Sequence, residues 1–119
     1  MKNAQIYNDP VIRRFLMLIS RSKKNGSPLS KIKELYLFGS RCRDDWRPDS
    51  DYDILIILKQ RDRGLKSRLY DIVMDILLDT GRLISLKIFT ESEFNRLKSI
   101  PTPFIENVLK EGIRLGASD

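Results

Sequence analysis

The fold is decided by one stretch of the sequence, residues 35–58, which reads LYLFGSRCRDDWRPDSDYDILIIL. An apolar run over residues 32–38 predicts a strand that Gly39 stops. The unbroken apolar run over residues 54–58, rich in β-branched side chains, is typical of a central strand covered on both faces. Because the intervening segment is short, the end of the first strand and the start of the second are expected to lie close together.

The flanking sequence alternates helical and strand patterns. A first helix is expected to start at Asp9-Pro10 and to end near residues 25–28, and a short helix is expected after Gly39. A longer helix over residues 65–78, closed by Gly81, should precede a strand over residues 83–89. The capping box Thr90–Glu93 predicts the start of a short helix, and a last helix should follow residues 101–103 and run to about residue 111. The sequence therefore predicts an α/β (α+β) fold with a small mixed sheet of three or more strands flanked by helices.

Length and composition bound the function. The chain has 119 residues, and we expect residues 1–119 to form a single domain. It contains no histidine, which excludes Ser-His-Asp triads, Cys-His pairs and His-ligated zinc. The single cysteine, Cys42, rules out an internal disulfide. No apolar run approaches the roughly 20 residues that span a bilayer, and no secretory signal begins the chain, so we expect a cytoplasmic protein without a membrane contact.

The net charge of +6 suits an anionic partner, either a nucleotide, a nucleic acid or an acidic protein surface. The basic residues are scattered along the sequence rather than clustered. Scattered Lys and Arg are more typical of solvated helix faces than of a nucleic-acid groove. Nucleic acid stays open as a partner but is not favoured, and a homo-oligomer also stays open.

The dipeptide Gly39-Ser40 lies where the first strand ends and a short helix is expected to begin. Backbone N–H groups at such a turn point outward and bind phosphate oxygens, and glycine allows the phosphate to approach closely. The Ser40 hydroxyl is a further donor, and Arg41 and Arg43 are candidates to neutralise phosphate charge. A lone Gly-Ser is usually an ordinary turn. It indicates a phosphate-binding site only in combination with the carboxylates at the start of the second strand.

Two carboxylates, Asp51 and Asp53, occupy that position. Because side chains alternate along a strand, both should project from one face, with Tyr52 turned away to pack. Carboxylates this close repel each other unless a proton or a cation lies between them, and Mg²⁺ with oxygen ligands suits the pair. A lone Asp-x-Asp is usually a solvated strand entrance. Beside a phosphate-binding turn it predicts metal-assisted phosphoryl or nucleotidyl transfer.

The pattern Gly39-Ser40, ten residues, Asp51-x-Asp53 resembles the signature of the minimal nucleotidyltransferase domains in the DNA polymerase beta superfamily. The resemblance extends over most of the chain from about residue 32, through residues 54–58, 90–94 and 108–113. It implies the nucleotidyltransferase fold, ATP or another nucleoside triphosphate bound at Gly39, Ser40, Arg41 and Arg43, and Mg²⁺ held by Asp51 and Asp53 as catalytic residues.

The resemblance also implies a biological setting. Small members of this superfamily act beside an all-helical partner, a HEPN-type ribonuclease toxin, as its antitoxin, and some transfer AMP from ATP to a tyrosine of the toxin. We therefore expect a nucleotidyltransferase that moves a nucleoside monophosphate to a hydroxyl, with such a toxin as its acceptor.

One position departs from the family pattern. The resemblance places the family's third carboxylate on the following strand at Ser85, which serves poorly either as metal ligand or as base. Lys87 lies on the same predicted face, where it could hold a substrate phosphate or simply face solvent.

Two further hypotheses about the function stay open. One is a non-catalytic, antitoxin-like binding module that neutralises a helical partner by occlusion. The other, less favoured because no substrate-binding domain follows the core, is an enzyme that modifies nucleic acid.

Overall fold

A computed structural model describes residues 6–21, 26–39 and 51–117. Its elements are α2 (Pro10–Ser20), the 3₁₀ helix η1 (Pro28–Lys31), β1 (Ile32–Phe38), β2 (Tyr52–Leu58), α3 (Arg63–Thr80), β3 (Ile84–Thr90), α4 (Glu91–Lys98), α5 (Pro103–Glu111) and β4 (Ile113–Ala117). The expected mixed α and β fold is confirmed. The short helix expected after Gly39 lies outside the described residues.

The four strands form one mixed sheet in the order β3-β2-β1-β4. β1 pairs antiparallel with β2 and with β4, whereas β2 and β3 run parallel and are joined by α3. β2 is thus an interior strand, as its apolar run predicts, and its residues Ile54 to Leu58 are all buried. At its start, Asp53 pairs with Phe38 on one side and with Ser85 on the other.

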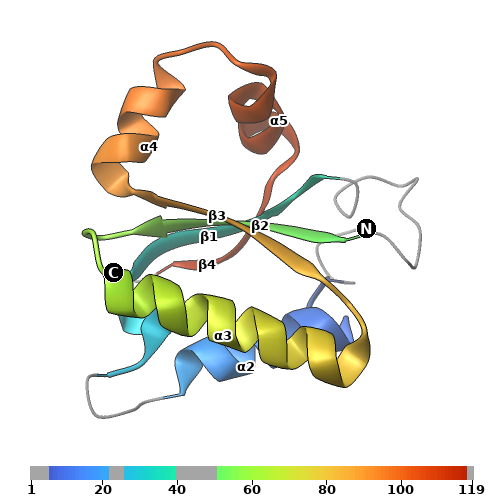
Figure 1. Ribbon diagram of the computed structural model, residues 1–119. Coiled ribbons are helices and arrows are strands. Elements are labelled where there is room, and N and C mark those ends of the chain that lie inside the picture. Colours follow the sequence, from blue (N-terminus) through green and yellow to red (C-terminus); the bar gives the residue numbers. More distant parts are fainter. Residues whose placement is uncertain (1–5, 22–25, 40–50, 118–119) are drawn as a thin grey trace.

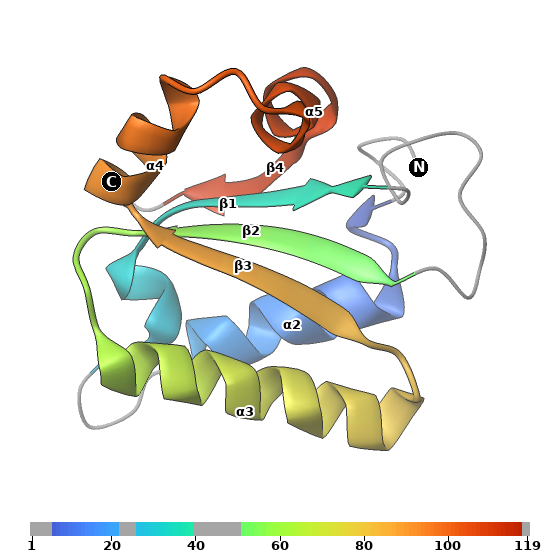
Figure 2. The same cartoon turned by 45° about the horizontal axis from the view of Figure 1, so that its top comes forward.

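Helices cover both faces of the sheet, with α2 and α3 on one face and α4 and α5 on the other (Figures 1 and 2). Alternation along β2 sends Tyr52, Ile54 and Ile56 into the larger core, which also contains buried residues of α2 and α3. The opposite face of β2 sends Leu55 and Ile57 into a smaller core beneath α4 and α5. The sheet therefore separates two cores, and Asp53 belongs to the face of the smaller one.

Local sequence signals explain where the helices begin and end. The Asp9 carboxylate accepts hydrogen bonds from the backbone N–H groups of Val11 and Ile12, at 2.8 and 3.1 Å, and so caps α2. Thr90 and Glu93 form the capping box that the sequence predicts at α4. Gly81 ends α3 in the left-handed region, at φ 72°.

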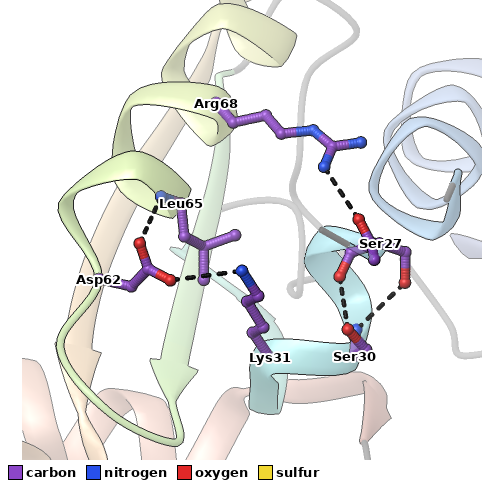
Figure 3. Close-up of polar contacts among 7 residues, drawn as sticks. Ser27, Ser30, Lys31, Asp62, Leu65 and Arg68 are labelled. Carbon is purple, nitrogen blue, oxygen red and sulfur yellow. Dashed lines mark hydrogen bonds and ion pairs between the residues drawn. The ribbon is translucent and has the colours of Figure 1, made fainter. Parts of the chain in front are cut away.

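The start of α3 is tied to η1 by polar contacts (Figure 3). Asp62 accepts a 2.9 Å hydrogen bond from the Leu65 N–H and forms a 3.5 Å ion pair with Lys31 of η1. Arg68, one turn further along α3, donates to the carbonyl oxygens of Gly26 and Arg21, at 3.2 and 3.1 Å. These contacts hold Gly26 and Lys31, which lie at the two ends of the described segment before β1, against the start of α3.

The structure adds two elements that the sequence patterns did not predict. The C-terminal residues 113–117 form an edge strand, β4, and residues 28–31 form the 3₁₀ helix before β1. β4 is short, contains a glycine and pairs only with a strand some 80 residues away in sequence. Among the described helices, none is long and apolar enough to cross a membrane.

Candidate active site

The two aspartates flank the first residue of β2. Tyr52, which lies between them, is buried at 3% exposure in the larger core, as the alternation predicts. Asp53 is half-buried on the opposite face of the sheet, and Asp51, directly before the strand, is exposed. The sheet therefore holds one carboxylate in place and leaves the other at the solvent boundary.

Gly39 lies against the carboxylate of Asp53. A Cβ atom added to Gly39 would overlap Oδ2 of Asp53 and would lie 3.2 Å from its Cγ and 3.3 Å from its Cβ. Gly39 also has φ 79°, a conformation that L-residues with a side chain rarely adopt. Both observations favour glycine here. The closeness to Asp53 results from the β1–β2 pairing, which places Asp53 opposite Phe38, the residue before Gly39.

The electrostatics of the pair are those of crowded carboxylates. Burial raises the pKa of Asp53 above its ordinary value, the negative charge of Asp51 raises it further, and the positive charge of Lys87 acts in the opposite direction. The negative charge of Asp51 therefore reaches Asp53, although burial is the larger cause of the raised pKa. A cation bound between them would relieve this repulsion.

The neighbouring strand β3 presents Ser85 and Lys87 to the same face. The parallel register pairs Asp53 with Ser85 and Leu55 with Lys87. Because side chains on one face repeat every two residues, Lys87 is the diagonal neighbour of Asp53. The positive charge of Lys87 acts on Asp53 across this diagonal. Ser85 and Lys87 share a face, as expected, since the alternating residues Ile84 and Leu86 are buried in the larger core on the opposite face.

Aromatic side chains border the site on the side of α5. Phe38, which pairs with Asp53, packs edge-on against Phe104 of α5 with ring centroids 5.5 Å apart. Phe104 also lies 6.3 Å from Phe89 of β3. These rings pack against the smaller core, between the sheet and α5.

A contact behind the sheet fixes the residue between the two aspartates. The Tyr52 hydroxyl donates a 2.7 Å hydrogen bond to Oδ2 of Asp9, the residue whose other oxygen caps α2. Sequence reasoning missed this link because the two residues are 43 positions apart. No local pattern signals it, and only the packing of α2 on the sheet brings the two side chains together.

The donors in this site suit a hard divalent cation. Asp51 and Asp53 offer carboxylate oxygens, which Mg²⁺ prefers over nitrogen or sulfur ligands. Within residues 6–21, 26–39 and 51–117, no group of three His, Cys, Asp or Glu side chains could hold a metal ion. The remaining residues predicted for the site, Ser40, Arg41 and Arg43, lie outside the described residues.

In this sheet, a glycine that follows one strand lies against an aspartate near the start of the next. The family to which the chain belongs defines its class, the nucleotidyltransferases. The family described as polymerase beta, nucleotidyltransferase, matches residues 21–119. The chain belongs to this family.

Individual relatives agree with this assignment. The chain is 35% identical over 108 residues to a protein of Methanocaldococcus jannaschii named "putative protein adenylyltransferase", a match that covers 87% of this chain and 93% of the relative.

Two solved structures share the fold. A toxin–antitoxin crystal structure with AMP-PNP matches with a TM-score of 0.56 and 18% identity, covering 90% of this chain and 73% of that chain. A mutant of the MntA–HpeT toxin–antitoxin matches with a TM-score of 0.52 and 15% identity, with the same coverage. Similarity at this level of identity concerns the fold alone.

Proposed function

We propose that this chain is a Mg²⁺-dependent nucleotidyltransferase that moves AMP from ATP to a hydroxyl group of a HEPN-type toxin, for which it serves as the antitoxin. The observation that carries the proposal is the contact of Gly39 with Asp53, beside Asp51. Membership of the nucleotidyltransferase family, the relative named as a protein adenylyltransferase and the toxin–antitoxin structures with the same fold support it.

Each side chain has a defined part in this proposal. Asp51 and Asp53 would hold Mg²⁺, which when bound neutralises substrate phosphates and the charge that develops during transfer. Gly39 leaves room for the carboxylate of Asp53 beside the turn, and Ser40, Arg41 and Arg43 would bind the triphosphate. The net charge of +6 favours an anionic substrate.

The transfer itself exchanges one bond for another. The acceptor hydroxyl oxygen forms a bond to the α-phosphorus of ATP, and the bond from that phosphorus to the oxygen that bridges to the β-phosphate breaks. Pyrophosphate leaves with the electron pair, and the hydroxyl proton passes to solvent. The half-buried position of Asp53 on a paired strand would hold the reacting groups in line, which is the main contribution a protein makes to phosphoryl transfer.

The test uses a purified HEPN-type toxin as acceptor, taken from the reading frame beside this one where that frame encodes such a protein. Incubated with this chain, ATP and Mg²⁺, it should gain the mass of one or more adenylyl groups, and peptide mapping should place them on hydroxyl side chains. Asp53→Asn should abolish the gain, and Asp75→Asn, on the exposed side of α3, should leave it unchanged. Parallel reactions with GTP, CTP and UTP identify the preferred nucleotide. An unmodified acceptor in all four reactions refutes the proposal.

A second candidate is a non-catalytic antitoxin that neutralises its partner by occlusion. The position of Ser85 directly opposite Asp53, where a carboxylate is expected from the family pattern, favours it. The two candidates differ in one cellular experiment. If the Asp51→Asn, Asp53→Asn double variant protects cells from the partner as well as the unaltered chain does, occlusion is sufficient and catalysis is not required.

A further inference from the structure

The side chains that β3 presents to the site decide its charge. Ser85, opposite Asp53, is neutral, and Lys87, on the diagonal, is a cation. Together with Asp51 and Asp53, these side chains carry a net charge of −1. With a carboxylate at the position of Ser85 and no lysine, the same face would carry −3. The described residues of this face therefore offer much less negative charge than a site with three carboxylates.

This difference bears on how many metal ions the site can hold. Two-metal sites of phosphoryl-transfer enzymes place two dications about 3.5–4 Å apart, and the charge of the ligands must offset their mutual repulsion. Here the β3 side of Asp53 offers a serine hydroxyl and an ammonium group. A second dication on that side would meet the like charge of Lys87, and the neutral hydroxyl of Ser85 would offset none of it. One dication between Asp51 and Asp53 would meet no such repulsion from its ligands.

Lys87 is available for another partner. The side chain is exposed, and none of the ion pairs within the described parts of the chain involves it. Its charge nevertheless reaches the site, because it opposes the rise in the pKa of Asp53. If a metal ion binds Asp53, the phosphate of a nucleotide bound to that ion would lie near the exposed ammonium group of Lys87.

We propose that the site works with a single divalent cation, held by Asp51 and Asp53, and that Lys87 takes the place of a second cation by binding the phosphate that is transferred. This inference rests on the proposed function and specifies which positive charges neutralise the substrate phosphates at that site. A lysine donates up to three hydrogen bonds to phosphate oxygens and carries one permanent positive charge at neutral pH. It can therefore stabilise the negative charge of the transferred group without an added ligand from β3.

The first test counts metal ions. Mn²⁺ is titrated into the full chain in the presence of a non-hydrolysable ATP analogue, with protein in excess over nucleotide, and bound Mn²⁺ is measured by electron paramagnetic resonance. We expect one Mn²⁺ per bound nucleotide. Two Mn²⁺ ions per nucleotide would overturn the inference and leave the proposed function intact. A failure of Mn²⁺ to promote nucleotide binding at all would refute both.

The second test removes the lysine. Lys87→Met should weaken binding of the analogue by about tenfold or more, since a charge-assisted hydrogen bond is lost, while Lys87→Arg should stay within about threefold of the unaltered chain. Lys110→Met, on the exposed side of α5, is the matched control for loss of one surface charge and should have no effect. Equal nucleotide affinity of Lys87→Met and the unaltered chain would show that Lys87 only faces solvent.

The third test restores the carboxylate. The double variant Ser85→Asp, Lys87→Met should bind two Mn²⁺ ions per nucleotide, provided that its urea unfolding midpoint shows a folded protein. If the double variant is unfolded, Ser85→Asp alone is used, and its nucleotide-free form should bind Mn²⁺ more tightly than the unaltered chain. Unchanged Mn²⁺ affinity and stoichiometry in these variants would overturn the role assigned to β3.

Discussion

The Tyr52 hydroxyl donates a 2.7 Å hydrogen bond to Oδ2 of Asp9, so the residue between the two aspartates is joined to the first turn of α2. Tyr52→Phe removes this bond and leaves one carboxylate oxygen of Asp9 without that donor. We expect the free energy of unfolding to fall by about 1 kcal/mol, the usual net value of such a bond. Urea denaturation measures the loss. Tyr70→Phe, on the exposed side of α3, should change it by less than about 0.5 kcal/mol.

Gly39→Ala should damage both the fold and the site. An alanine at φ 79° strains the backbone by about 1–2 kcal/mol, and its Cβ would displace the Asp53 carboxylate. Gly81→Ala separates these effects, because Gly81 has φ 72° but a Cβ there would meet no atom within 4 Å. Both variants should lose stability in urea because of the backbone strain that they share. Only Gly39→Ala should lose Mg²⁺-dependent ATP binding, and equal ATP affinity of the two variants would count against the site.

Removal of metal should weaken nucleotide binding. In the presence of a chelator, Asp51 and Asp53 repel the triphosphate, so calorimetry should show ATP affinity lower by more than about tenfold, or about 1.4 kcal/mol. In the double variant Asp51→Asn, Asp53→Asn, the chelator should have no effect. The double variant Asp71→Asn, Asp75→Asn removes two exposed carboxylates from α3 and should respond to the chelator as the unaltered chain does.

The pH dependence of stability should report on Asp62. The hydrogen bond from the Leu65 N–H lowers the pKa of Asp62, and the charge of Lys31 lowers it further (Figure 3). A lowered carboxyl pKa contributes stability above the pKa of the unfolded chain, and this contribution is lost as the pH falls through the folded-state value. Asn also caps helices but carries no charge. The stability difference between the unaltered chain and Asp62→Asn should therefore be present at pH 7 and shrink on acidification. A difference that is constant down to pH 2 would contradict the assignment.

The parts of the fold that depend on local patterns could be predicted. The alternation at the start of β2 predicted that Tyr52 packs and that Asp53 faces the other way, and the capping box at Thr90 predicted the start of α4. Both depend only on residues close in sequence. The register that places Ser85 opposite Asp53 was expected from the family resemblance rather than from a local pattern, and the pairing of β2 with β3 agrees with it.

Features that depend on distant pairing could not be predicted. β4 is a five-residue edge strand whose identity depends on β1, and its sequence has no strong strand pattern of its own. The Tyr52 hydrogen bond to Asp9 and the contact of Phe38 with Phe104 join residues 43 and 66 positions apart. The contact of Gly39 with Asp53 lies between these cases. Its residues were singled out from the sequence, but the close approach that favours glycine became visible only in three dimensions.

The division of the molecule into two cores has a consequence for how it fails on heating. Within the described residues, the larger core contains 20 buried side chains and the smaller one only five: Leu55, Ile57, Phe94, Ile105 and Val108. Layers held by few apolar contacts open as local units while the remainder stays folded. We expect α4 and α5 to separate from the sheet first and to show the faster amide exchange. Because Asp53 lies on the face of the sheet that α4 and α5 cover, the temperature at which activity is lost would then depend on these five side chains. Stronger packing beneath α2 and α3 would raise the melting temperature of the protein but would not raise the temperature at which activity is lost.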